Sequence, residues 1–207
     1  MKLLVLTFLI LEFTFCGCYC QNRITNDAGK SSGLGTQEIL KSKNEIQNLI
    51  RQVLIWSESK ESIELLPAIK DRKDSAYVGF EMNKLKINLD KLAQTGFFAT
   101  EFIENYCQII RTIDKKIRNK ELEAWLVGDL PPFNFVNGIN PWCQCQGFSQ
   151  NDFDKVEIIK LDNKSGELKW IWKAGLSWTN FYFRVVKDDN KWKITYMEGF
   201  DFKESTK

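Results

Sequence analysis

Apolar residues recur every three or four positions in two long segments of the chain. The first segment starts at Thr36, and its apolar stripe predicts a helix of about 20 residues that ends near Ser57. The second follows Gly96 and predicts a helix with acidic residues early and basic residues late, the order that the helix dipole favours. A shorter helix is expected between them, over Lys84–Leu92. The two stripes consist of Ile39, Ile46, Leu49, Ile50, Val53 and Trp56, and of Phe98, Phe102, Tyr106, Ile109 or Ile110, Ile113 and Ile117.

The C-terminal part of the chain changes to the two-residue alternation that is typical of β-strands. Segments rich in β-branched and aromatic residues predict strands over Lys155–Asp162, Glu167–Lys173, Trp178–Lys187 and Lys191–Phe200. Short polar connections between them predict hairpins and therefore an antiparallel meander. The expected fold class is α+β, with two or three N-terminal helices packed on one face of a curved antiparallel sheet of four or more strands.

Simple alternation assigns the side chains of these strands to two faces. With an even number of residues in each connecting loop, Trp170 faces Phe181, and Leu168 faces Phe183. The same rule pairs Val185 with Trp192, Phe183 with Ile194, Phe181 with Tyr196, and Arg184 with Lys193. The apolar face, which is expected to receive the helices, carries Leu168, Trp170, Trp172, Phe181, Phe183, Val185, Trp192, Ile194 and Tyr196.

The opposite face of the predicted sheet is basic and partly aromatic. Its most informative residues are Lys169, Lys173, Trp178, Tyr182, Arg184 and Lys193. A solvated sheet surface accounts for this composition without any function. The alternative is a docking surface for an acidic partner, with Trp178 and Tyr182 as its aromatic anchors.

Residues 1–20 have the features of a signal peptide. Lys2 supplies a positive charge, and the apolar stretch that follows is interrupted by Glu12 and is too short to span a bilayer. Gly17-Cys18 resembles the processing site of bacterial lipoproteins, so Cys18 is expected to carry a lipid that holds the protein in the bacterial envelope. The alternative is cleavage after Cys20, which gives a soluble periplasmic or secreted protein. Residues 21–35 predict a flexible polar tether, and residues 36–207 predict a single domain.

Composition removes several classes of function. The chain contains no histidine, which excludes Ser-His-Asp and Cys-His nucleophile systems and histidine-ligated zinc. Lys and Arg number 29 and Asp and Glu 27, so a net charge of +2 gives no general attraction to nucleic acid. Membrane contact is expected only through the N-terminal lipid. Because the chain has no phosphate loop, nucleotide fingerprint or acidic metal motif, we expect neither a metal nor a cofactor.

Three cysteines, Cys107, Cys143 and Cys145, follow the predicted signal peptide. An exported chain lies in a compartment where disulfides form. A bond between Cys143 and Cys145 would close a small, unfavourable ring, so we expect one structural disulfide from Cys107 to either of them. Three unbonded thiols, or a Cys-x-Cys redox site, are the alternatives.

Three short motifs stand out beside the helix spacing: Gly96–Phe102 before the second long helix, Asn140-Pro141-Trp142, and Lys191-Trp192-Lys193-Ile194 in the last strand. Together with the helix spacing they resemble the NTF2-like (cystatin-like) α+β superfamily, in particular its uncharacterised secreted and lipoprotein members from bacteria. The resemblance covers about residues 37–202, although the superfamily's usual first hairpin between the early helices is not evident in the sequence. It implies a cone of sheet and helices that often encloses a pocket, and it does not decide between binding and catalysis.

The residues expected to line such a cone are Tyr106, Trp142, Trp170, Trp172, Phe181, Trp192 and Tyr196. The expected function is non-catalytic binding of a small molecule or an envelope protein, through the cone or the basic sheet face. One alternative is an isomerase- or hydratase-like enzyme, with Tyr106, Asp129, Asp152 or Tyr196 as the acid or base. The other is an immunity or inhibitor protein that acts through the basic face.

Overall fold

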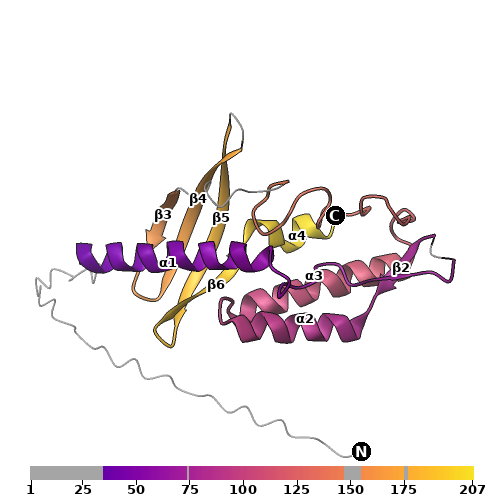
Figure 1. The fold of residues 1–207 in the computed structure, drawn as a ribbon, viewed down its shortest axis with the longest axis horizontal. Helices are drawn as coiled ribbons and strands as arrows, with labels where there is room; N and C mark the ends of the chain where they lie inside the picture. The colour runs from indigo at the N-terminus through magenta and orange to yellow at the C-terminus, as the bar shows by residue number, and fades with distance from the viewer. Residues whose placement is uncertain (1–34, 74, 147–154, 175–176) are drawn as a thin grey trace, which may run out of the picture. The chain divides into compact units, whose positions relative to one another are not determined.

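The C-terminal sheet dominates the structure, which is a computed structural model describing residues 35–207 apart from 74, 147–154 and 175–176. Four antiparallel strands follow one another in the order β3-β4-β5-β6, as Figure 1 shows. Their bounds are β3 (Lys155–Leu161), β4 (Ser165–Ala174), β5 (Ser177–Asp188) and β6 (Lys191–Met197). The predicted fold class is confirmed, because N-terminal helices pack on this four-stranded meander. Cys18 and the rest of residues 1–34 lie outside the described residues.

The two long amphipathic helices lie where periodicity predicts them. Helix α1 is Thr36–Ser57, and α3 is Thr100–Arg118. Their stripes enter the core, with Ile46, Val53, Phe102 and Ile110 fully buried. Helix α2 (Met82–Thr95) is longer at both ends than the prediction of Lys84–Leu92, and it ends at Gly96, whose φ of +69° a glycine adopts without strain.

A small hairpin joins α1 to α2. It pairs β1 (Ala68–Lys70) with β2 (Tyr77–Phe80), strands too short to show alternation in the sequence. The Asp71 carboxylate closes the turn by accepting hydrogen bonds from the Ser75 hydroxyl and backbone, which lower the pKa of Asp71. On α3, Asp114 Oδ1 accepts a hydrogen bond of 2.6 Å from the Phe80 N–H and so fixes β2 to that helix.

The predicted register between β4 and β5 is confirmed. Trp170 pairs with Phe181, and Leu168 pairs with Phe183. All four side chains are at most 4% exposed, so this face of the hairpin is the buried one. The prediction assumed an even number of residues in the loop between the two strands, and the observed register agrees with it. One buried face therefore runs across both strands.

The predicted register between β5 and β6 is wrong in all four pairs. The strands meet in a two-residue turn, so Lys187 pairs with Trp192 and Val185 with Ile194. A β-bulge then leaves Thr195 without a partner, and Arg184 pairs with Tyr196. Because one extra residue reverses the alternation beyond it, Tyr196 leaves the helix-facing side and Met197, which is fully buried, replaces it. Lys193 pairs with Val186 rather than with Arg184.

The chain ends in two short helical segments that sequence analysis assigned to the last strand or left unassigned. After β6 come the 3-10 helix η2 (Glu198–Phe200) and α4 (Phe202–Ser205). Phe200 is fully buried, and its ring centroid lies 4.5 Å from that of Trp142 and 4.9 Å from that of Phe102. This aromatic cluster fixes the residue 140–146 loop and the C-terminus to α3. Among the helices of the described residues, none is long and apolar enough to cross a bilayer.

Candidate functional site

Most residues expected to line an internal pocket are packed in the core instead. Tyr106 and Phe181 are fully buried, and Trp142 and Trp170 are 2% and 4% exposed. Trp142 illustrates their role, because its ring lies 5.6 Å from both Trp56 and Phe98 between centroids. The Trp172 side chain lies outside the described residues. The remaining two candidates, Trp192 and Tyr196, each line a surface cleft.

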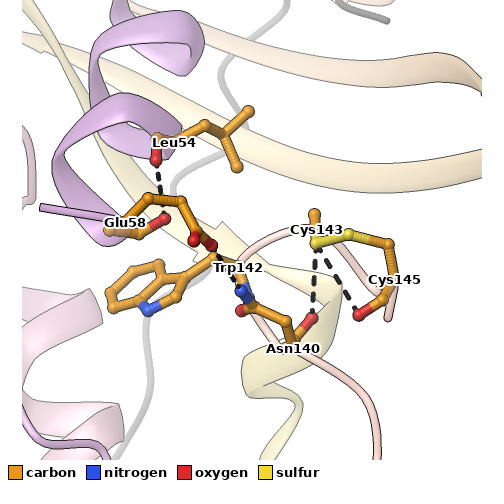
Figure 2. Close-up of a disulfide and its surroundings, with 7 residues drawn as sticks. Leu54, Glu58, Asn140, Trp142, Cys143 and Cys145 are labelled. Carbon is orange, nitrogen blue, oxygen red and sulfur yellow. Dashed lines mark hydrogen bonds between the residues drawn. A yellow bond between two sulfur atoms is a disulfide. The ribbon is translucent and has the colours of Figure 1, made fainter. Parts of the chain in front are cut away.

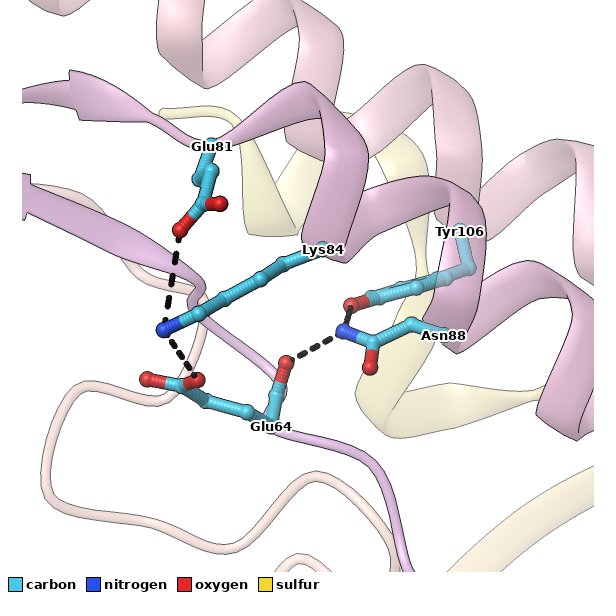
Figure 3. A network of polar contacts seen from close by, with 5 residues as sticks. All are labelled: Glu64, Glu81, Lys84, Asn88 and Tyr106. Carbon is cyan, nitrogen blue, oxygen red and sulfur yellow. Dashed lines mark hydrogen bonds and ion pairs between the residues drawn. The ribbon is translucent and has the colours of Figure 1, made fainter.

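Tyr106 is held in a polar network inside the helical layer (Figure 3). Its hydroxyl donates to the Leu65 carbonyl at 3.1 Å and accepts from Asn88 Nδ2 at 3.3 Å. Asn88, itself 5% exposed, also donates to the Glu64 carbonyl at 2.7 Å. Burial raises the pKa of Tyr106 well above its ordinary value, the largest of the effects on it. These contacts tie α3 and α2 to the segment before β1 and give Tyr106 a structural role.

One surface cleft, here called the Trp192 cleft, lies between three elements and has a volume of about 460 Å³. Helix α1 contributes four residues of one helical face: Glu45, Asn48, Leu49 and Gln52. The connection between α2 and α3 contributes Thr95, Gly96 and Phe97. The turn between β5 and β6 contributes Asn190, Lys191 and Trp192. In Figure 1 this turn lies below α1, beside the end of α2.

Backbone hydrogen bonds position the second wall of the cleft. Gly96 ends α2, and the Thr95 hydroxyl donates to the Leu92 carbonyl and accepts from the Phe97 N–H. Ile194 in β6 then donates to the Phe97 carbonyl at 2.8 Å and accepts from the Ala99 N–H at 2.9 Å. The α2–α3 connection is thereby fixed to the outer edge of β6, which brings Phe97 next to Trp192.

The third wall is a tight hairpin turn. Asp188 pairs with Lys191, so only Asp189 and Asn190 form the loop, with φ angles of +49° and +60°. Positive φ at both central residues is the turn geometry whose twist matches that of antiparallel strands, and Asp and Asn adopt it more easily than most residues. The turn holds Asn190 and Lys191 at the rim and Trp192 in the wall.

Trp192 carries the unusual polar group of the cleft. The side chain is 6% exposed, and its Nε1 is buried without a hydrogen-bond partner among the described residues. The Lys187 ammonium lies 5.4 Å from the ring centroid on the paired strand. A buried N–H that lacks an acceptor costs about 1–3 kcal/mol. Folded proteins contain few such groups, so each of them needs an explanation.

Two lysines of the basic sheet face are neutralised by carboxylates of the chain itself, and Arg184 lies over an aromatic ring. Lys169 pairs with Glu157 at 2.9 Å, and Lys193 pairs with Asp188 at 2.6 Å. The Arg184 guanidinium carbon lies 4.5 Å from the centroid of the Tyr196 ring. Tyr182 is 43% exposed. The side chains of Lys173 and Trp178 lie outside the described residues.

A second cleft of about 560 Å³ borders this face and the C-terminal segment. It brings Tyr196 together with three carboxylates, each of which already has a partner. Glu198 accepts a hydrogen bond from the Tyr182 N–H, and Glu204 pairs with Lys207. Asp201 accepts from the Tyr196 hydroxyl at 3.4 Å and from the Glu204 N–H that begins α4. These groups stabilise the end of the sheet.

The structure corrects the predicted disulfide. Cys143 bonds to Cys145, whereas Cys107 is free and half-buried. The bond lies in a tight turn beside the end of α1, where Asn140 Nδ2 donates to Glu58 Oε1 at 3.2 Å (Figure 2). The ring closes because Gln144 adopts a φ of +51°, a conformation the pattern of cysteines does not reveal. A disulfide is typical of proteins in oxidising compartments.

The predicted acid–base residues are not brought together. Asp129 is exposed in a turn, and its backbone carbonyl accepts the Trp125 indole N–H at 3.1 Å. Asp152 lies outside the described residues. Within the part of the chain that is described, no group of three or more His, Cys, Asp or Glu side chains is placed to hold a metal ion.

The chain was compared with protein-family models, curated proteins and solved structures, and only a solved structure matched. No protein-family model matches the chain, and no curated protein is similar to it. Among solved structures, the chain is similar to a protein of unknown function from Bacteroides thetaiotaomicron VPI-5482, with 13% identity and a TM-score of 0.35. The similarity covers 78% of this chain and 94% of the other.

Proposed function

We propose that this chain is a non-catalytic binding domain of the bacterial cell envelope and that it binds a small molecule in the Trp192 cleft. The observation that carries the proposal is the Trp192 cleft of about 460 Å³, whose lining combines the apolar Leu49, Phe97 and Trp192 with amides such as Asn48 and Gln52. Small-molecule sites have volumes of roughly 300–1,000 Å³ and combine an apolar wall with a few convergent polar groups.

The positions of the titratable candidates support binding rather than catalysis. A general acid or base has to reach the substrate. Tyr106 is fully buried, and its hydroxyl is held by Leu65 and Asn88. Tyr196 faces the other side of the sheet from the helices and is bonded to Asp201.

Envelope location and superfamily complete the proposal. Cys18 carries a lipid that anchors the domain through the tether of residues 21–35, and the Cys143–Cys145 disulfide is consistent with an oxidising compartment. We also propose that the domain belongs to the NTF2-like superfamily. Support comes from the helices packed on a four-stranded meander and from the hairpin β1–β2 between α1 and α2, the element that was not evident in the sequence.

The test is nuclear magnetic resonance with a library of small fragments of mixed charge. The Trp192 indole N–H signal is assigned by its loss in Trp192→Phe, and the Trp125 indole N–H, which already has a partner, serves as an internal control. We expect several fragments to shift the Trp192 signal and the Phe97 and Gln52 amides while leaving Trp125 unchanged. If no fragment of the library shifts these signals, the proposal is contradicted.

A further inference from the structure

We infer that the Trp192 cleft binds an uncharged, hydroxyl-rich ring, that is, a neutral saccharide. This inference rests on the proposed function, since it names the ligand class for the same cleft. Three properties of the lining carry it: its balanced charge, its amide side chains and its apolar side chains.

The charged side chains that line the cleft sum to a net charge of zero. Glu45 and Lys191 are the titratable side chains that line it, and they come from opposite walls, α1 and the β5–β6 turn. A site for an anionic ligand gathers cations or backbone N–H groups, and a site for a cation gathers carboxylates. One charge of each sign favours a ligand without net charge.

The remaining polar side chains are mainly amides. Asn48 and Gln52 lie four residues apart on α1, which places them on the same helical face, and Asn190 projects from the turn opposite. Each amide offers both an acceptor oxygen and a donor NH₂ group. A hydroxyl group likewise donates and accepts, so a ring that carries several hydroxyls can bond to amides on both walls at once.

Each wall of the cleft also carries one apolar side chain. Leu49 of α1, Phe97 of the α2–α3 connection and Trp192 of the β5–β6 turn line the cleft, and the buried Trp192 N–H has no acceptor among the described residues. A sugar ring has an apolar face of C–H groups and a rim of oxygens. Its C–H face would cover Phe97 and Leu49, while its oxygens bond to the amides. A purely apolar ligand would cover the amides without giving them hydrogen bonds, and the lining would not neutralise a charged ligand.

The experiment titrates the purified chain with maltose, cellobiose and N,N′-diacetylchitobiose and follows the Trp192 indole N–H signal. Glucuronate, the anionic counterpart of a neutral sugar, and a blocked, uncharged tripeptide are the comparison ligands. We expect saturable shifts with at least one neutral disaccharide and affinity at least fivefold lower for glucuronate and the tripeptide.

Two variants test the assigned contacts. Gln52→Ala is expected to lower the affinity for the saccharide at least fivefold, because it removes an exposed amide of the cleft and leaves the core unchanged. The matched control is Gln108→Ala, which removes an exposed glutamine from α3 outside the cleft and should leave the affinity unchanged.

The outcomes separate the two proposals. If library fragments shift the Trp192 signal but no saccharide does, or if glucuronate or the tripeptide binds more tightly, the saccharide inference is wrong and the binding cleft stands. If neither fragments nor saccharides shift it, both are wrong. Equal loss of affinity in Gln52→Ala and Gln108→Ala would also overturn the inference.

Discussion

The Arg184 guanidinium lies over the Tyr196 ring, 4.5 Å from its centroid, on the side of the sheet that faces away from the helices. The contact exists because the bulge at Thr195 reverses the alternation of β6. Tyr196 also donates to Asp201, so one pair of residues links the outer sheet face to the start of α4. Burial, together with Asp201 and Glu198, raises the pKa of Tyr196, whereas Arg184 acts in the opposite direction.

Replacing Arg184 should reveal this contact. Arg184→Ala is expected to lower the free energy of unfolding by about 0.5–1 kcal/mol, the range for a cation–π contact at an exposed site. The same change should raise the pKa of Tyr196 further, since the positive charge that favours the phenolate is lost. Denaturant unfolding and an alkaline spectroscopic titration measure the two effects. Arg111→Ala, at an exposed position of α3, is the control and should change neither.

Two buried tryptophans offer a matched comparison of hydrogen bonding. Trp125 and Trp192 are 7% and 6% exposed, but only Trp125 has an acceptor for its indole N–H, the Asp129 carbonyl. Both Trp→Phe variants lose apolar volume, whereas only Trp125→Phe loses a hydrogen bond. We therefore expect Trp125→Phe to be the more destabilising by about 1 kcal/mol in urea unfolding of the ligand-free chain. Equal costs would show that Trp192 Nε1 has an acceptor in solution.

The disulfide between Cys143 and Cys145 should stabilise the fold only modestly. Loop-closure entropy for a three-residue ring amounts to about 1.6 kcal/mol, whereas the longer loop from Cys107 to Cys143 would give about 3.8 kcal/mol. Cys143→Ser with Cys145→Ser is thus expected to cost about 1–2 kcal/mol in denaturant unfolding.

Peptide mapping checks the pairing independently. In the unreduced, unfolded chain, iodoacetamide should label Cys107 and leave Cys143 and Cys145 linked within a single peptide. A peptide pair joined through Cys107 would contradict the structure. The Cys107→Ser variant is the control, since it should unfold at nearly the same denaturant concentration as the unmodified chain.

Tyr106 should make the protein sensitive to alkali. Its pKa is raised in the folded chain above the value of about 10 for an unfolded tyrosine, and both states keep the proton below pH 10. Above that pH the unfolded chain releases the proton and the folded chain retains it, so stability falls by about 1.4 kcal/mol per pH unit until the folded pKa is reached.

The measurement compares Tyr106→Phe with the unmodified chain from pH 8 to pH 11. We expect the variant to be less stable by about 1 kcal/mol at pH 8, because the bonds with Leu65 and Asn88 are lost, and to show a shallower decline above pH 10. Tyr182→Phe, at an exposed tyrosine, should keep the steep decline. Identical slopes in all three proteins would exclude Tyr106 as the source.

The elements that sequence reasoning located best are those with long, regular burial patterns. The buried stripe from Ile46 to Val53 covers about two full helical turns, which makes its period clear, and α1 ends at Ser57 as predicted. Strands β1 and β2 have three and four residues, which is too few for alternation to stand out. The short α4 depends on the Asp201 side chain, which accepts the Glu204 N–H at its start.

The candidate site was found only in part. Trp192 was predicted from its face of the sheet, but it lines a surface cleft with Asn48 and Gln52 of α1, which sequence reasoning left unassigned. Amides on the polar face of an amphipathic helix look the same whether they meet solvent or a ligand. The feature that separates them, the cleft that Asn48 and Gln52 share with Trp192, exists only after the chain has folded.

By itself the sequence determined the α+β class, the two long helices, the four strands and the buried face shared by β4 and β5, because each follows from a local period of burial. Tertiary structure alone decided which way Tyr196 points and which cysteines bond, since one bulged residue and one positive φ at Gln144 leave no periodic trace. It also decided that the aromatic residues fill the interior while the cleft opens at Trp192. Packing between distant segments sets those outcomes, and packing has no local signature in the chain.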